Sequence, residues 1–161
     1  MGSLIAITRV LLVMALASLR AQLASAQAPL RPEDFVIAGI RDGLDSASVR
    51  RLLGGPDSVS FTDDPGAPEH KIAHWNYRRL SVVLTTRVLG INVSQRGVRT
   101  HRGLRVGDSL DRVQRLYGPP AQQDGTDWWY CDPADSTASH VMLIDTTGHR
   151  VAWIYIGWYT D

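Results

Sequence analysis

The sequence predicts an α+β fold made of two tandem helix-plus-antiparallel-sheet repeats, with the helices on one face of the sheet. Two observations support this prediction. A strongly patterned helix is expected at residues 108–117, and the stretch around it, residues 107–120, aligns without a gap with residues 43–56. Short runs of β-forming residues separated by turn residues follow each stretch, as expected for antiparallel strands covered by a helix.

The helix expected at residues 108–117 has a start signal, an apolar stripe and a stop signal. Asp108 and Ser109 can accept hydrogen bonds from the unpaired N–H groups of a first helical turn. Gly118 and the two prolines that follow it end the helix. The apolar side chains recur at three- and four-residue spacing and so share one face: Leu110, Val113, Leu116 and Tyr117.

The internal match extends beyond this helix. Val49 aligns with Val113 and Gly54 with Gly118, so a helix closed by glycine is also expected in the earlier stretch. Three blocks recur in the same order, which favours a duplicated unit over chance composition: residues 43–56 with 107–120, 75–77 with 128–130, and 87–93 with 150–156.

Strands are expected after each helix, where β-forming residues lie between turn signals. In the first repeat we expect strands at residues 57–61, 71–77, 80–86 and 88–94, with a turn at 63–66. In the second we expect strands at residues 128–130, 140–144 and 151–159, with a turn at 146–149. Upstream of the first helix, Phe35 is one of several apolar anchors, and Pro32 suits the first position of a helical turn.

The first 26 residues have the pattern of an export signal. Arg9 precedes an apolar run at residues 10–17 that is too short to span a bilayer, and Ala-Ser-Ala at 24–26 fits a cleavage site. The rest is expected to form one compact domain with these parts: an N-terminal arm (27–39), a first repeat (40–96) and a second repeat (97–161). We expect a periplasmic or secreted location and no transmembrane helix once the signal is removed.

The charge balance argues against nucleic-acid binding. The chain has 17 Lys and Arg against 16 Asp and Glu, and removal of Arg9 and Arg20 with the signal leaves 15 against 16. A nearly neutral chain lacks the basic surplus that general nucleic-acid binding requires. Because there is a single cysteine, Cys131, the chain forms no internal disulfide framework. We interpret Cys131 as a small buried apolar residue; a nucleophilic thiol and an intermolecular disulfide are the alternatives.

No constellation of residues in the sequence requires catalysis, a metal or a cofactor. The chain has no P-loop, no Gly-x-Ser-x-Gly and no His-Glu-x-x-His motif. His70 and His74 are four residues apart in an expected strand, which would separate them by about 13 Å, too far to share a zinc ion. We therefore expect a protein that is not an enzyme, with no cofactor and no metal.

Comparison of the two repeats singles out three aromatic residues. Successive side chains of the last strand alternate faces, so Trp153 and Tyr155 are expected on the face opposite the helices. The first repeat has small or polar residues at the matching positions, and the same change occurs at Trp129. We predict that these three aromatic side chains form a patch that binds a protein partner. Alternatively, the arm, a loop or the other half covers this face.

The connector between the repeats is rich in arginine. Arg99, Arg102 and Arg105, with Arg96 before them, form a basic run. We predict that Arg99, Arg102 and Arg105 contribute to binding an acidic partner, or to peripheral association of the protein with anionic headgroups at the envelope. The alternative is a solvated connector neutralised by nearby aspartates.

The helix closed by Gly-x-Pro, at residues 43–56 and 107–120, followed by antiparallel strands, resembles the SmpA/OmlA family of small outer-membrane-assembly lipoproteins. The tandem arrangement is similar to the β-lactamase-inhibitory-protein fold. The resemblance covers residues 40–159. This chain differs from the lipoproteins in having no cysteine behind the signal, and from the inhibitory proteins, which disulfides usually staple, in having one cysteine.

The resemblance implies an exported, non-catalytic protein-binding or envelope-assembly module that acts through its sheet face. A secreted protein inhibitor of a hydrolase is the alternative, implied by the similarity to the inhibitory proteins. A third hypothesis, an enzyme that uses Cys131 or the histidines, predicts rapid labelling of Cys131 by a thiol reagent in the folded protein.

Overall fold

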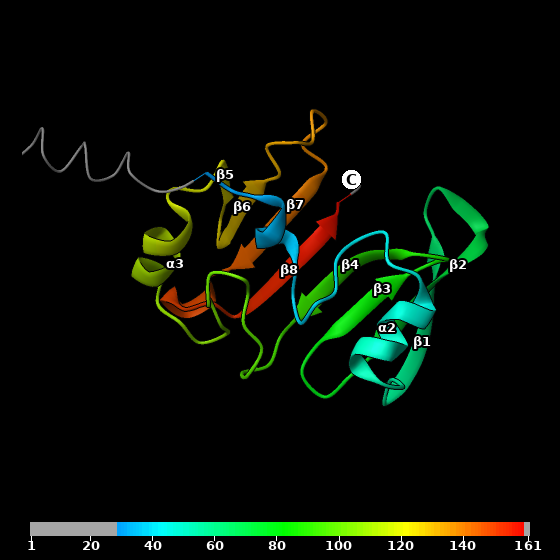
Figure 1. The fold of residues 1–161 in the computed structure, drawn as a ribbon. Coiled ribbons are helices and arrows are strands. Elements are labelled where there is room, and N and C mark those ends of the chain that lie inside the picture. The colour runs from blue at the N-terminus through cyan, green and yellow to red at the C-terminus, as the bar shows by residue number, and fades with distance from the viewer. Residues whose placement is uncertain (1–28, 160–161) are drawn as a thin grey trace, which may run out of the picture.

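The computed structural model describes residues 29–159, so the export signal expected at residues 1–26 lies outside the described residues. In chain order, the elements are η1 (Pro32–Phe35), α2 (Ser46–Leu53), β1 (Ser58–Asp64), β2 (Ala67–Asn76), β3 (Ser81–Leu84), β4 (Val88–Val93), α3 (Leu110–Tyr117), β5 (Gln122–Asp124), β6 (Asp127–Cys131), β7 (His140–Asp145), η2 (Thr147–His149) and β8 (Trp153–Trp158). Figure 1 shows the strands side by side across the molecule.

The strands form one eight-stranded antiparallel sheet in the order β1-β2-β3-β4-β8-β7-β6-β5. The predicted fold class of two tandem helix-plus-sheet repeats is therefore wrong. β4 and β8 pair from Gly90↔Gly157 to Val93↔Ile154, so the backbone ladder runs unbroken through the middle of the sheet. Matching residues 43–56 with 107–120 identifies helices and their ends, but it carries no information on which strands pair.

The two helices have the same length and end alike, but they begin differently. Gly54 and Gly118 close α2 and α3 with φ of 80° and 78°, a region that favours glycine. Asp45 caps α2 by accepting a hydrogen bond from the Ser48 N–H at 2.7 Å. The side-chain cap predicted for α3 is absent, because Ser109 makes no cap bond and Asp108 accepts from the Arg105 N–H instead.

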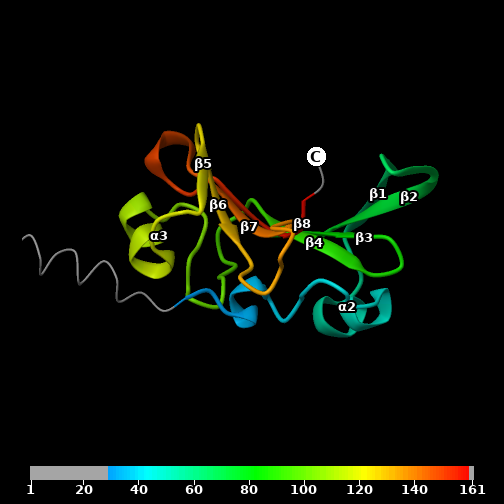
Figure 2. The same ribbon diagram turned by 90° about the horizontal axis from the view of Figure 1, so that it is seen from above.

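The hydrophobic core lies on one face of the sheet. Figure 2 shows α2 and η1 on this side. Val49 of α2 and Val113 of α3 are fully buried there, in one cluster with strand side chains such as Ile91 and Ile156. Side chains from the arm and the connector complete this cluster: Phe35, Ile37, Ile40 and Leu104. We call this side of the sheet the helix face and the opposite side the open face.

All seven expected strands are present, with different ends. The turn at residues 63–66 is confirmed between β1 and β2, and the helical turn that begins at Pro32 is confirmed as η1. β5 was missed because its three residues are polar and exposed, so no apolar alternation marks it. Within residues 29–159, no helix is long and apolar enough to cross a membrane.

Candidate functional site

The open face of the sheet carries a groove of about 360 Å³ with an aromatic wall. Figure 2 shows that both ends of the curved sheet rise on this side, away from α2. Side chains from both halves of the sheet line the groove: Pro65, Ile72, Val83, Leu89, Asn92, Leu143, Trp153, Tyr155, Trp158 and Tyr159. The structure thus brings two of the three predicted aromatic residues, Trp153 and Tyr155, together on the face where the sequence placed them.

The Tyr155 side chain packs over the backbone of Gly90 and Gly157, which we call the glycine platform. Gly90 and Gly157 face each other across β4 and β8, and a Cβ atom on Gly90 would lie only 2.5 Å from the Tyr155 hydroxyl. That hydroxyl donates a hydrogen bond to the Trp158 carbonyl at 2.7 Å, and burial raises the pKa of Tyr155. In the comparison of the two repeats, Gly90 is the small residue that matches Trp153. The structure shows that its missing side chain leaves room for the Tyr155 ring.

Trp129 lies in an adjoining hollow rather than in the groove itself. Its ring packs edge-on against Tyr159, with centroids 4.7 Å apart and an interplanar angle of 87°. Tyr159 borders both the groove and this second hollow of about 380 Å³, which Cys131 also lines. The indole N–H of Trp129 is buried and has no hydrogen-bond partner in the described part of the chain.

The three predicted arginines lie in different environments. Arg102 is held inside the molecule: its guanidinium binds Asp34 through Nε–Oδ1 at 2.7 Å and Nη2–Oδ2 at 2.6 Å, and it also donates to the Leu116 carbonyl. The hydrogen bonds to Asp34 raise the pKa of Arg102. Arg99 is exposed and Arg105 half-buried, and neither lines the aromatic groove.

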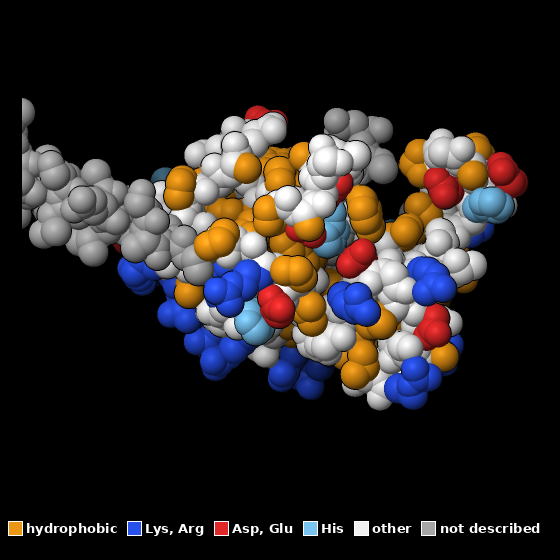
Figure 3. Space-filling view, turned by 45° about the horizontal axis from the view of Figure 1, so that its top comes forward, with side chains coloured by type: hydrophobic (Ala, Val, Ile, Leu, Met, Phe, Trp, Pro, Cys, Tyr) orange, Lys and Arg blue, Asp and Glu red, His pale blue; other side chains and the backbone are white. Residues whose placement is uncertain are grey.

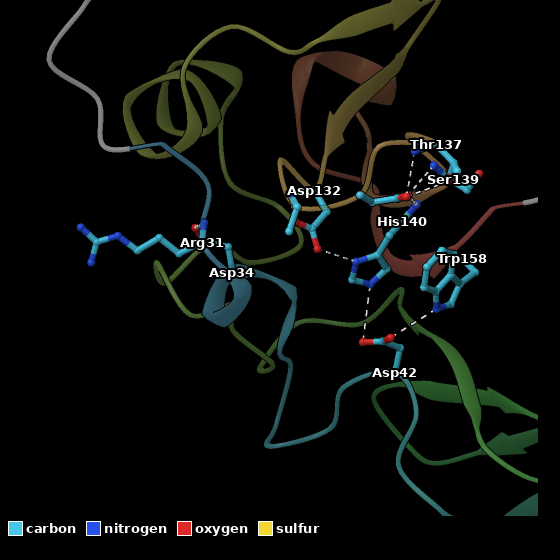
Figure 4. Close-up of polar contacts among 10 residues, drawn as sticks. Arg31, Asp34, Asp42, Asp132, Thr137, Ser139, His140 and Trp158 are labelled. Atoms are coloured by element: carbon cyan, nitrogen blue, oxygen red, sulfur yellow. Dashed lines mark hydrogen bonds and ion pairs between the residues drawn. The ribbon is translucent and has the colours of Figure 1, made fainter.

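A buried histidine at the rim of the helix face was missed by sequence reasoning (Figure 4). His140 Nδ1 lies 2.8 Å from Asp132 Oδ2, and its Nε2 lies 3.6 Å from Asp42 Oδ1. Trp158 Nε1 donates to the second oxygen of Asp42 at 3.2 Å. The imidazole is also sandwiched between the rings of Phe35 and Trp158, with centroids 4.8 and 5.1 Å away.

The surroundings of His140 do not match a hydrolytic triad. Such a triad needs a hydroxyl or thiol nucleophile at the ring nitrogen opposite the orienting carboxylate. Here Nε2 faces Asp42 and has no hydrogen-bond partner among residues 29–159. The contacts around His140 instead join three segments that are distant in sequence. They also hold Trp158 at the end of the open-face groove.

The loop between Asp132 and His140 is built around Asp135. Its carboxylate accepts hydrogen bonds from the hydroxyl and N–H of Thr137 and from the N–H groups of Ser139 and His140. These bonds lower the pKa of Asp135 from 3.8 to about 2. A loop of two aspartates ending on a histidine was the sequence signal that could have indicated this cluster.

Cys131 is a half-buried free thiol on the open face. It pairs with Val141 across β6 and β7, so the neighbouring His140 points to the other face of the sheet. The residues that line its hollow include no histidine, lysine or arginine that could activate the thiol. Among residues 29–159, no group of three or more His, Cys, Asp or Glu side chains is arranged to hold a metal ion.

Comparison with known proteins adds information on the fold. No family model and no curated protein matches the chain. A crystal structure described as an extracellular protein containing a SCP domain, from Bacillus anthracis str. Ames, is similar, with a TM-score of 0.51 and 11% sequence identity. The match covers 81% of this chain and 48% of that structure, so the chain spans about half of its length. At this identity the likeness shows the fold alone.

Proposed function

We propose that this protein is an exported, non-catalytic protein-binding or envelope-assembly module whose contact surface is the open face of the sheet. The observation that carries the proposal is the aromatic groove, with Trp153 and Tyr155 on the face of the sheet opposite α2 and η1. Aromatic side chains supply much of the energy of protein interfaces, and monomers rarely leave them grouped at the surface without a use.

The aromatic side chains on the open face are preorganised for binding. Tyr155 is fixed by its hydrogen bond and its glycine platform, and Trp129 is braced by Tyr159. Side chains that are already held lose little rotational freedom on binding, which favours affinity. The polar residues Gln122 and Asp124 border the hollow around Trp129 and can serve as a hydrated rim.

Two further points support an exported binding module. The structural neighbour is described as extracellular, and the helix motif resembles that of the SmpA/OmlA lipoproteins and the inhibitory proteins. Within residues 29–159, His140 Nε2 has no hydroxyl or thiol partner, and the side chains that line the hollow at Cys131 include no histidine, lysine or arginine to activate the thiol, which supports a role without catalysis.

The test is site-specific crosslinking in the native envelope fraction. A photoreactive residue at Leu89, inside the groove, is expected to capture a specific protein, whereas the same residue at Arg115 of α3 is not. The variant with Trp129→Asn and Trp153→Gly should lose capture while it stays folded. The matched control, Phe61→Ser, removes an exposed aromatic side chain that lies outside the groove and should retain capture.

Equal capture from Leu89 and Arg115, or full capture by the Trp129 and Trp153 variant, would contradict the proposal. The captured protein could be a soluble hydrolase that loses all activity when mixed 1:1 with this protein. That result would identify this protein as a hydrolase inhibitor, the alternative function.

A further inference from the structure

A second surface hollow, distinct from the aromatic groove, is lined by three arginines. Arg78 and Arg79 come from the turn between β2 and β3, and Arg96 comes from the connector after β4. Ser94, Gln95 and Val106 complete the lining of this hollow of about 450 Å³. Figure 3 shows Lys and Arg side chains gathered along the lower margin of the view.

No described residue of the chain neutralises the positive charge in this hollow. No aspartate or glutamate lines the hollow. Within residues 29–159, the side chains of Arg78, Arg79 and Arg96 make no hydrogen bond or ion pair with the protein. Arg102 and Arg112, by contrast, each pair with an aspartate. Three unpaired like charges around one hollow repel one another unless an anion enters.

Two of these exposed arginine side chains lie close to glycines. Gly97 and Gly107 have φ of 106° and 93°, and their missing Cβ atoms leave room for guanidinium groups. A Cβ on Gly97 would lie 3.0 Å from Arg79 Nη1, and one on Gly107 would lie 3.1 Å from Arg96 Nε.

The chemistry of the hollow favours a phosphate group. Guanidinium is planar and presents pairs of N–H donors that match two oxygens of a phosphate. Three such groups can satisfy more than one phosphate charge. The volume of about 450 Å³ is in the range of small-ligand sites and leaves space for a second phosphate or an organic moiety.

We propose that Arg78, Arg79 and Arg96 form a binding site for a phosphate-bearing ligand at this end of the sheet. The site is independent of the open-face function, because none of its residues lines the aromatic groove. The ligand is either a free phosphorylated molecule or the headgroup of a phospholipid, since both present the same oxygens to the guanidinium groups.

The test measures binding of pyrophosphate to the full chain by calorimetry, and binding to phosphatidylglycerol vesicles by flotation, with phosphatidylcholine vesicles as the control. The triple variant Arg78→Gln, Arg79→Gln, Arg96→Gln should lose at least about tenfold in affinity. A control with the same loss of charge elsewhere, Arg41→Gln, Arg51→Gln, Arg115→Gln, should stay within about twofold.

A triple arginine-to-lysine variant separates the geometry of the site from its charge. Lysine keeps the charge but loses the planar fork, so affinity should fall several-fold at unchanged net charge. Pyrophosphate binding alone identifies a free ligand, and vesicle binding that pyrophosphate displaces identifies a lipid headgroup. The proposal is overturned if neither probe binds, if the control variant loses as much affinity as the triple variant, or if oligoglutamate of equal charge binds as well as pyrophosphate.

Discussion

Arg102 shows how a charged residue can be structural in this protein. Asp34 is 1% exposed, and its carboxylate is bound by the Arg102 guanidinium, which also lies over the ring of Tyr117. We predict that Arg102→Ala lowers the free energy of unfolding by about 3–5 kcal/mol, because it leaves a buried carboxylate without its cationic partner. Arg99→Ala, at an exposed position, should change it by less than about 0.5 kcal/mol. Urea titrations of both variants measure this, and equal effects would contradict it.

Gly90 offers a residue-level test of how the groove is built. An added methyl group at position 90 would collide with Tyr155, so the ring must leave its platform and its hydrogen bond to the Trp158 carbonyl must break. We predict that Gly90→Ala weakens capture of the partner while the chain remains folded. Tyr155→Phe, which removes the hydrogen bond but keeps the ring, should weaken it less. The measurement is crosslinking yield from Leu89, and an unchanged yield in Gly90→Ala would count against the platform.

At the scale of elements, the loop after β6 predicts a dependence on pH. The pKa of Asp135 is lowered from 3.8 to about 2, so its carboxylate stabilises the folded state at every pH above 3.8. This stabilisation is lost as the pH falls from 3.8 towards 2. Thermal unfolding of wild type and Asp135→Asn should therefore differ in midpoint above 3.8 and converge near 2. A difference that stays constant over this range would show that the charge of Asp135 is not the cause.

Elements with a local signal could be predicted from the sequence, and those that depend on long-range pairing could not. Helix α3 and its closing Gly118 follow from apolar spacing and a glycine, and both are present. The alternation that placed Trp153 and Tyr155 on one face is equally local. The junction of β4 with β8 has no local signal, and neither does the meeting of His140 with Asp42, which lies about a hundred positions earlier. For the same reason, no local signal in the sequence places Arg78 and Arg79 near Arg96.

At the scale of the whole molecule, one sheet and one core predict a single unfolding transition. Ile91 of β4 and Ile156 of β8 face each other at the centre of the sheet, and both are fully buried. Ile91→Ala and Ile156→Ala should each lower the free energy of unfolding by about 2–5 kcal/mol. Because the two side chains are direct neighbours, the double variant should deviate from the sum of the single effects by at least about 0.5 kcal/mol.

The number of unfolding midpoints distinguishes one cooperative sheet from two units that unfold independently. The aromatic reporters lie on both sides of the junction, with Trp75 in β2 and Trp128 in β6, both buried in the same core. If the β4–β8 ladder couples the two sides, variants in which Trp75 or Trp128 is the sole remaining one of the five tryptophans should give the same fluorescence midpoint as circular dichroism. Ile91→Ala, on the β4 side, should then shift the Trp128 midpoint as much as the Trp75 midpoint. Two separate midpoints, with only the Trp75 signal shifted, would mean that the central ladder joins the strands without making them fold together.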